Sequence, residues 1–326
     1  MDHRNRNRTL RPALALFTAA AVSLALAACG GDPGQANRLL RQTFDGQHQV
    51  KSGELGVVLT VTPSGAATLT RPLRLSLVGP FQSLGPGKLP ASALSIRVVT
   101  NETDAAATIT STGSVGYVTF RGQSYKLPQA TFQRLESSFA QLASAPGRGH
   151  GSGTLGRLGI HPEHWLSTPQ IVGKEAIQGV NTTHIRSRIN VAALLADLNT
   201  FLQRASSSGV TPAGVLPRSI PGADRRHIAS RVKNSTVNVW TGVADKTLRR
   251  LAIDLRVPVS GQLSTLLGRS AAIALTMQYA NLNQPQTITA PTKLQPYSQF
   301  EAKLRMLVEG VGSGLISRAA GSATGG

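Results

Sequence analysis

The sequence predicts an α+β protein built on a single large curved antiparallel sheet, with helices packed on its concave, apolar face. Two observations carry this prediction. Roughly nine segments alternate apolar and polar residues with a period of two, as half-buried strands do. The links between the early strands are short and rich in turn residues, too short for crossover helices, and the helical segments fall in two blocks between groups of strands.

The first 28 residues have the pattern of an export signal. Arginines at the start precede an apolar run at 13–28, whose 16 residues fall short of the ~20 that a transmembrane helix needs. The stretch LAAC at 26–29 resembles the lipobox of bacterial lipoproteins, in which a diacylglycerol is attached to the cysteine and the signal is cut before it. We therefore expect a signal peptide at 1–28, a lipid-anchored Cys29 outside the cytoplasm and a flexible tether at 29–35. The alternative is a plain secretory signal in which Cys29 has no role.

The elements are expected in the following order. A helix at 36–46 is followed by a meander of strands at 55–62, 72–79, 94–100, 105–112 and 115–122. An amphipathic helix at 128–145 leads into a Gly-rich loop at 146–153. Then come a strand at 183–190, a helix at 191–205, a loop at 206–222, a short helix at 225–233, and strands at 235–241, 247–257 and 271–280.

The chain is expected to end in a helix at 298–309 and a disordered Gly/Ser/Ala tail at 312–326. The loop at 146–153 is the one plausible boundary between two domains. Because neither side of it has a complete sheet of its own, we favour one domain over 36–311.

Composition indicates the surroundings of the protein. The 34 Lys and Arg against 15 Asp and Glu give a net charge of +19, and +16 remains without residues 1–28. Such a chain is attracted to anionic headgroups and acidic wall polymers, whereas nucleic acid is not expected as a partner of an exported lipoprotein. A GC-rich genome would also favour arginine. With one cysteine, no disulfide is expected.

Catalytic patterns are weak in this chain. The segment HPEHW places His161 and His164 three residues apart with Glu163 between them, a spacing that can hold a metal on a helix, but no third ligand is apparent. There is no Gly-x-Ser-x-Gly elbow and no phosphate-binding loop, and the carboxylates are scattered. We therefore predict no enzyme activity, no metal and no cofactor. An envelope hydrolase that uses HPEHW is the least favoured alternative.

Several segments together resemble the actinobacterial lipid-carrier lipoproteins of the LppX/LprG type, which are structural relatives of LolA and LolB. They are the lipobox at Cys29, QVKSGELGVVLTV at 49–61, the stretches 172–198 and 237–255, and LNQPQTITAP at 282–291. The resemblance implies an eleven-strand-like half-barrel closed on one side by helices, with an apolar cavity between, that carries acyl chains of lipids or lipoglycans. Loops 79–90 and 161–169 do not match the pattern.

Individual binding residues do not transfer from the resemblance, because the lining of a cavity is not a motif. Apolar side chains on the helix-facing side of the strands would supply it, and each could equally be ordinary core. The candidates are Leu73, Leu75, Leu77, Leu94, Ile96, Ile109, Ile253, Leu255, Ile273, Leu275 and Met277. The alternative function is a non-enzymatic envelope interaction or sensor-accessory lipoprotein with a filled core.

Overall fold

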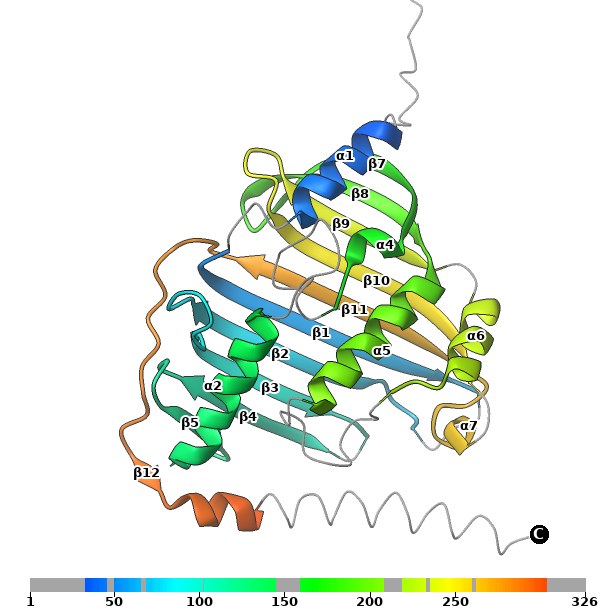
Figure 1. Ribbon diagram of the computed structural model, residues 1–326. Helices are drawn as coiled ribbons and strands as arrows, with labels where there is room; N and C mark the ends of the chain where they lie inside the picture. Colours follow the sequence, from blue (N-terminus) through cyan, green and yellow to red (C-terminus); the bar gives the residue numbers. More distant parts are fainter. Residues whose placement is uncertain are drawn as a thin grey trace, which may run out of the picture.

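One sheet of twelve strands organises the chain. The computed structural model describes residues 33–45, 50–65, 69–101, 103–144, 159–207, 219–232, 235–259 and 262–303. The strand order is β12-β6-β5-β4-β3-β2-β1-β11-β10-β9-β8-β7, and every pairing is antiparallel except the parallel contact of β12 with β6 (Figure 1). The predicted curved antiparallel sheet, a half-barrel with helices on one face, is confirmed.

The strands are β1 (Ser52–Ser64), β2 (Leu73–Gln82), β3 (Ala91–Val99), β4 (Asp104–Ser111), β5 (Gly116–Phe120), β6 (Gln123–Lys126), β7 (Leu166–Ile177), β8 (Val180–Ile189), β9 (Thr236–Gly242), β10 (Leu248–Pro258), β11 (Ser270–Ala280) and β12 (Leu294–Gln295). The helices are α1 (Pro33–Phe44), α2 (Gln129–Ser144), α4 (Pro162–Trp165), α5 (Val191–Ser207), α6 (Gly222–Arg231) and α7 (Gln262–Leu267). A further helical segment covers 297–303.

The nine predicted strands are all present, and three more were missed. The strand expected at 115–122 ends at Phe120, because Arg121 and Gly122 both adopt positive φ and turn the chain into β6. An Arg-Gly pair is not one of the usual sequence marks of such a turn. Strand β7 was missed because its pairing with β8 shifts register twice, which breaks the alternation of apolar residues. Strand β12 has only two residues.

Helix boundaries differ modestly from the expected ones. Helix α1 begins at Pro33, inside the stretch expected to be a tether, since proline suits the first turn of a helix. Helix α6 begins at Gly222 rather than at residue 225, and the short α7 was not predicted. The signal peptide, Cys29, the loop at 146–153 and the tail at 312–326 lie outside the described residues.

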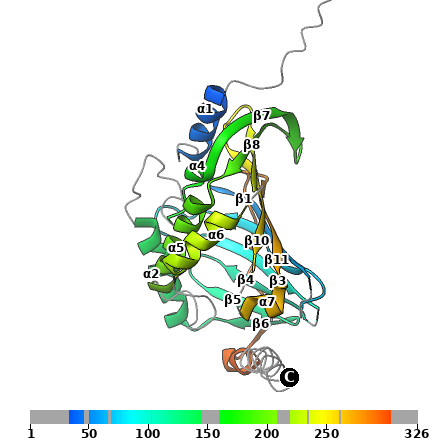
Figure 2. The same cartoon turned by 90° about the vertical axis from the view of Figure 1, so that its right-hand side faces the viewer.

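The two halves of the chain meet in the middle of the sheet. Strand β1 pairs with β11 over eleven residue pairs, from Glu54 with Ala280 to Ser64 with Ser270. Strands that precede and follow residues 146–153 therefore form one continuous sheet. Helices α1, α2, α4, α5 and α6 lie on one side of it (Figure 2). We call the side that carries these helices the inner face and the opposite side the outer face.

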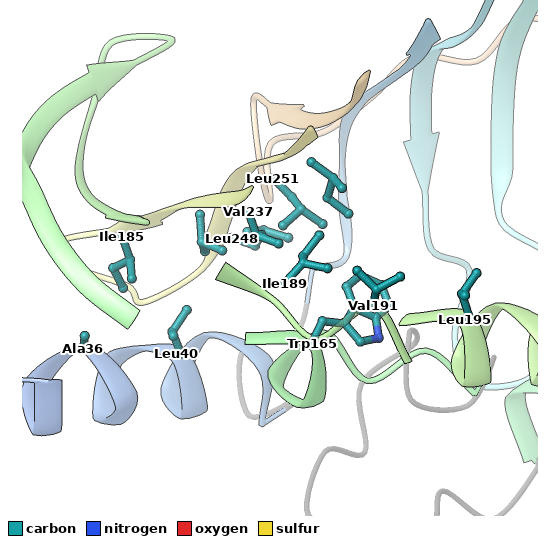
Figure 3. Packing of buried hydrophobic residues seen from close by; sticks show 12 residues of the cluster. Ala36, Leu40, Trp165, Ile185, Ile189, Val191, Leu195, Val237, Leu248 and Leu251 are labelled. Carbon is teal, nitrogen blue, oxygen red and sulfur yellow. The ribbon is translucent and has the colours of Figure 1, made fainter. Parts of the chain in front are cut away.

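The hydrophobic core lies at the β7–β10 side of the inner face. Side chains of β8, β9 and β10 pack there against α1, α4 and α5 (Figure 3). Trp165 of α4 stands in the middle of this cluster and is 6% exposed. The cluster consists of Ala36, Leu40, Trp165, Ile185, Ile189, Val191, Leu195, Val237, Val239, Leu248, Leu251 and Ile253. No helix in the described ranges combines the length and apolar character needed to span a bilayer.

Candidate functional site

The eleven apolar residues singled out in the sequence share the inner face. Residues that pair directly across antiparallel strands point to the same side of a sheet. Leu251 of the core pairs with Met277, which pairs with Val57, which in turn pairs with Leu77. The rows running across the strands in this way are Leu251–Met277–Val57–Leu77–Ile96, Ile253–Leu275–Leu59–Leu75, Leu255–Ile273–Val61–Leu73 and Leu94–Ile109–Val118.

Strand β1 supplies residues of this face that were not among the candidates. Val57, Leu59 and Val61 stand between the candidates of β2 and those of β11. Their alternation is visible in the sequence LGVVLTV, so the period of two could have identified them. The inner face is thus one apolar surface that runs without a break from β10 to β4.

Exposure divides this surface into two parts. Ile253 is 3% exposed and belongs to the core cluster, while Leu255, Leu275 and Met277 pack against that cluster as partly buried neighbours. Farther along the same rows, Leu75 of β2 is 39% exposed and Ile109 of β4 is 40% exposed. We call the inner-face residues of β1–β4 and β11 the open apolar face; Leu275 and Met277 form its border with the core, and its candidates other than Leu75 and Ile109 are half-buried.

Helices α5 and α2 stand in front of the open apolar face but leave Leu75 and Ile109 exposed (Figure 1). Leu195 and Leu202 of α5 are themselves buried, and Phe132 of α2 is buried against β5, where Gly116 leaves no side chain in its way. The apolar cavity expected between the sheet and these helices stays a prediction.

Two aromatic side chains close one end of the open apolar face. Tyr279 pairs with Leu55 and Phe81 pairs with Gly53, which places both rings on the inner side. The rings meet edge to face with their centroids 6.2 Å apart. Burial raises the pKa of the Tyr279 hydroxyl above its ordinary value, so this group stays neutral.

The HPEHW segment has a structural role in the described contacts. The carboxylate oxygen Oδ2 of Asp197 on α5 accepts the backbone N–H of His161 at 2.6 Å and the indole Nε1–H of Trp165 at 2.9 Å. These bonds attach α4 to α5 and hold Trp165 in the core. The rings of His161 and His164 stack with centroids 5.2 Å apart. Within the described ranges, no group of three or more His, Cys, Asp or Glu side chains is placed to hold a metal ion.

A polar network on the outer face joins four strands. The Trp240 ring on β9 stacks on the ring of His184 on β8, with centroids 4.4 Å apart and planes 13° from parallel. One oxygen of Glu175 on β7 accepts the Trp240 indole N–H and lies 3.1 Å from His184 Nδ1. The guanidinium of Arg250 on β10 lies 5.0 Å from the centre of the Trp240 ring. The sequence did not indicate this network, because the β-bulges of β7 obscure which residues face one another.

The C-terminal segment covers an edge of the sheet. After β11 the chain passes the ends of β1 and β2, where Gln284 and Gln286 bond to Ser52 and Gln82, and then reaches β6 (Figure 1). Phe300 packs against Tyr125 with ring centroids 5.5 Å apart, and Lys303 Nζ donates to the Tyr125 hydroxyl at 2.9 Å. Strand β6 is therefore not left as a bare edge.

Comparison with known proteins finds likeness among solved structures alone. No family model matches the sequence, and no curated protein matches it. The chain is similar to the crystal structure of LprF from Mycobacterium bovis, with 16% identity over 79% of this chain and 98% of that one, at a TM-score of 0.42. It is also similar to the lipoprotein LppX of Mycobacterium tuberculosis, with 15% identity over 79% of this chain and 100% of that one, at a TM-score of 0.37.

A LolA superfamily protein from Nitrosomonas europaea is a more distant match. Its identity is 9% over 77% of this chain and 94% of that one, at a TM-score of 0.19. LppX and this LolA superfamily protein carry the names of the groups that the sequence resembles.

Proposed function

We propose that this protein is an extracytoplasmic lipoprotein, anchored to the cell membrane through Cys29, that binds the acyl chains of a lipid or lipoglycan and carries it within the cell envelope. The acyl chains lie against the open apolar face, between β1–β4 and β11 on one side and α2 and α5 on the other. The observation that carries the proposal is the exposure of apolar side chains on the face that helices shield.

The different exposure of two residues in one row supports the proposed acyl-chain binding. Leu75 and Ile253 stand on the same face of the same sheet, yet one is 39% exposed and the other 3%. A sheet that had filled its core would bury both. Covering such a surface with an acyl chain contributes about 0.8 kcal/mol per CH₂ group removed from water, without any need for precise polar contacts.

The first test is native mass spectrometry of the full chain carrying Cys29→Ala, expressed in an actinobacterial host and followed by organic extraction. We expect a bound acyl lipid that survives purification. A ligand-free mass, together with failure to bind added envelope lipids, would overturn the carrier function and favour the interaction module with a filled core.

A matched pair of variants locates the bound lipid. Leu75→Glu places a charge on the open apolar face, while Val78→Glu places one on the outer face of the same strand, where Val78 is 48% exposed. We expect Leu75→Glu to abolish lipid retention and Val78→Glu to leave it unchanged. Equal retention by both variants would place the lipid elsewhere.

The anchor has a separate test. Replacing Cys29 by serine removes the only thiol to which a diacylglycerol could be attached. We expect the wild-type protein in the membrane fraction with an acylated N-terminal peptide starting at Cys29. We expect Cys29→Ser to lack that modified peptide. Recovery of an unmodified Cys29 in mature protein would support the plain secretory signal instead.

A further inference from the structure

Arginines gather at one end of the sheet. Pro258 at the end of β10 pairs with Ser270 at the start of β11, and Ser64 at the end of β1 pairs with the same Ser270. Helix α6 contacts β10, and α7 contacts β1 and β11, so both helices lie at this end, which faces the viewer in Figure 2. We call the following set the arginine end: Arg71 before β2, Arg225, Arg226 and Arg231 of α6, Arg256 of β10 and Arg269 before β11.

Among the described residues, the arginine end carries more positive than negative side chains. Five of its six arginines are exposed, and Arg225 is half-buried. None of the ion pairs found between described residues includes any of them. The acidic side chains described at this end are Asp224 of α6, Asp254 of β10 and Asp104 of β4, and Asp104 pairs with Arg97.

The opposite end of the strands has a different charge pattern. Around the turn that joins β9 to β10, the Arg249 guanidinium pairs with Asp245. Glu54 at the start of β1 accepts a hydrogen bond from Asn281, and Glu175 contacts His184. Lysines are present there too, but acidic groups are interspersed with them. Acidic partners therefore accompany the basic groups at that end, whereas the six arginines of the arginine end take part in none of the ion pairs found between described residues.

The arginine end adjoins the open apolar face. The last inner-face row before this end consists of Leu255, Ile273, Val61 and Leu73, of which three are candidate lipid-binding residues. An acyl chain lying along this face would thus have unpaired guanidinium groups beside it. Guanidinium groups bind phosphate oxygens in a forked geometry and are less strongly hydrated than ammonium groups.

We propose that the arginine end docks the protein on the headgroups of anionic lipids in a bilayer, so that this end of the open apolar face meets the membrane surface. The exchange of a lipid at this end rests on the proposed function. The docking itself does not need a bound ligand. Each arginine that reaches an anionic surface strengthens binding by about fivefold, and salt weakens the attraction.

The test compares two triple variants in the full chain with Cys29→Ala. The patch variant replaces Arg226, Arg231 and Arg269 by glutamine. The control variant replaces Lys51, Lys88 and Lys174 by glutamine. These lysines are exposed away from the arginine end, and their replacement removes the same total charge. Flotation with vesicles of phosphatidylcholine, alone or with one third phosphatidylglycerol, gives the preference of each chain for anionic lipid. The basic leader is common to both variants and cancels in the comparison.

We expect the patch variant to lose on the order of 100-fold of the preference for anionic vesicles, and the control variant to lose far less. Raising the salt concentration should remove the difference between them. Equal losses in the two variants would overturn the proposal. Binding of a soluble polyglycerol phosphate at the arginine end without any vesicle binding would also overturn it, and would assign the surface to an acidic wall polymer.

Native mass spectrometry of the same patch variant separates this inference from the proposed function. A patch variant that retains its acyl lipid but loses vesicle docking supports both statements. If no variant carries lipid and the patch effect on vesicles persists, the carrier function fails while the docking surface stands.

Discussion

At the scale of the residue, exposure separates two roles that hydropathy cannot distinguish. Leu75 and Ile253 are both aliphatic, both in alternating strands and both on the inner face. Only the surroundings differ, because α1, α4 and α5 pack on β8–β10 while the inner face of β2–β4 keeps exposed leucine and isoleucine side chains. The loss of unfolding free energy when each side chain is truncated should follow this difference in exposure.

We expect Ile253→Ala to lower the free energy of unfolding by about 3 kcal/mol, because it empties volume in a close-packed core. Leu75→Ala should lower it by less than about 1 kcal/mol, since the side chain is already partly in contact with water. Urea unfolding of ligand-free protein measures both values. Equal losses would indicate that the open apolar face is packed as core.

Tyr279 provides a pH-dependent prediction. The pKa of its hydroxyl is raised in the folded protein by burial, from an ordinary value of about 10, so the neutral form is favoured by folding. The stability that this preference contributes is complete below pH 10 and is lost as pH rises through the folded pKa. The free energy of unfolding should therefore fall more steeply above pH 10 in the wild type than in Tyr279→Phe. Parallel pH profiles would contradict this assignment.

At the scale of the element, short helices depend on tertiary contacts. Helix α4 has four residues and no side-chain hydrogen bond at its N-cap, so it cannot be stable alone. Asp197 of α5 holds it through two hydrogen bonds, one to His161 and one to Trp165.

Replacing Asp197 by alanine leaves both of these donors without their acceptor and should cost about 2 kcal/mol of stability. Amide hydrogen exchange in α4 should become faster. Asp224→Ala, which removes the same charge from the exposed surface of α6, is the control and should cost less than about 1 kcal/mol. A loss in the control as large as that of Asp197→Ala would show that charge, and not the two bonds, matters.

The edge strand β6 depends in the same way on the C-terminal segment. Phe300 packs on Tyr125 and Phe120, and β12 pairs with β6 over only two residues. Phe300→Ala should speed amide exchange in β6 and promote self-association measurable by light scattering, because a freed edge pairs with other strands. Ser298→Ala, an exposed position beside it, should do neither. Unchanged exchange in Phe300→Ala would mean that the segment does not protect the edge.

At the scale of the whole molecule, the continuous sheet couples regions far apart in sequence. Strand β1 lies beside β11, so the centre of the sheet forms only when both ends of the chain are present. Such non-local pairing predicts slow folding and cooperative unfolding. The arginine end also belongs to this scale, because it brings together residues of α6 and β10 and residues that precede β2 and β11.

We expect ligand-free protein to unfold in urea in one transition. Fluorescence of Trp165 and Trp240, both on the β7–β9 side, should report the same midpoint as the far-ultraviolet circular dichroism of all strands. Two separate midpoints would show that the side carrying the core and the side carrying the open apolar face unfold independently. That result would favour two domains over one.

The sequence by itself determined the fold class, nine of the twelve strands and the helices α1, α2, α5 and α6, because a half-buried strand and an amphipathic helix each mark their buried side in the periodicity of apolar residues. It also determined that the eleven candidates share a face, since alternation within a strand is local. Only the tertiary structure decided which of them are core and which stay exposed, because the helices that cover Ile253 and leave Leu75 open are brought there by contacts across the chain. For the same reason the bulged β7, the Glu175–His184–Trp240 network and the arginine end could not be read from the sequence: each depends on register or on neighbours far away in the chain, which no local pattern records.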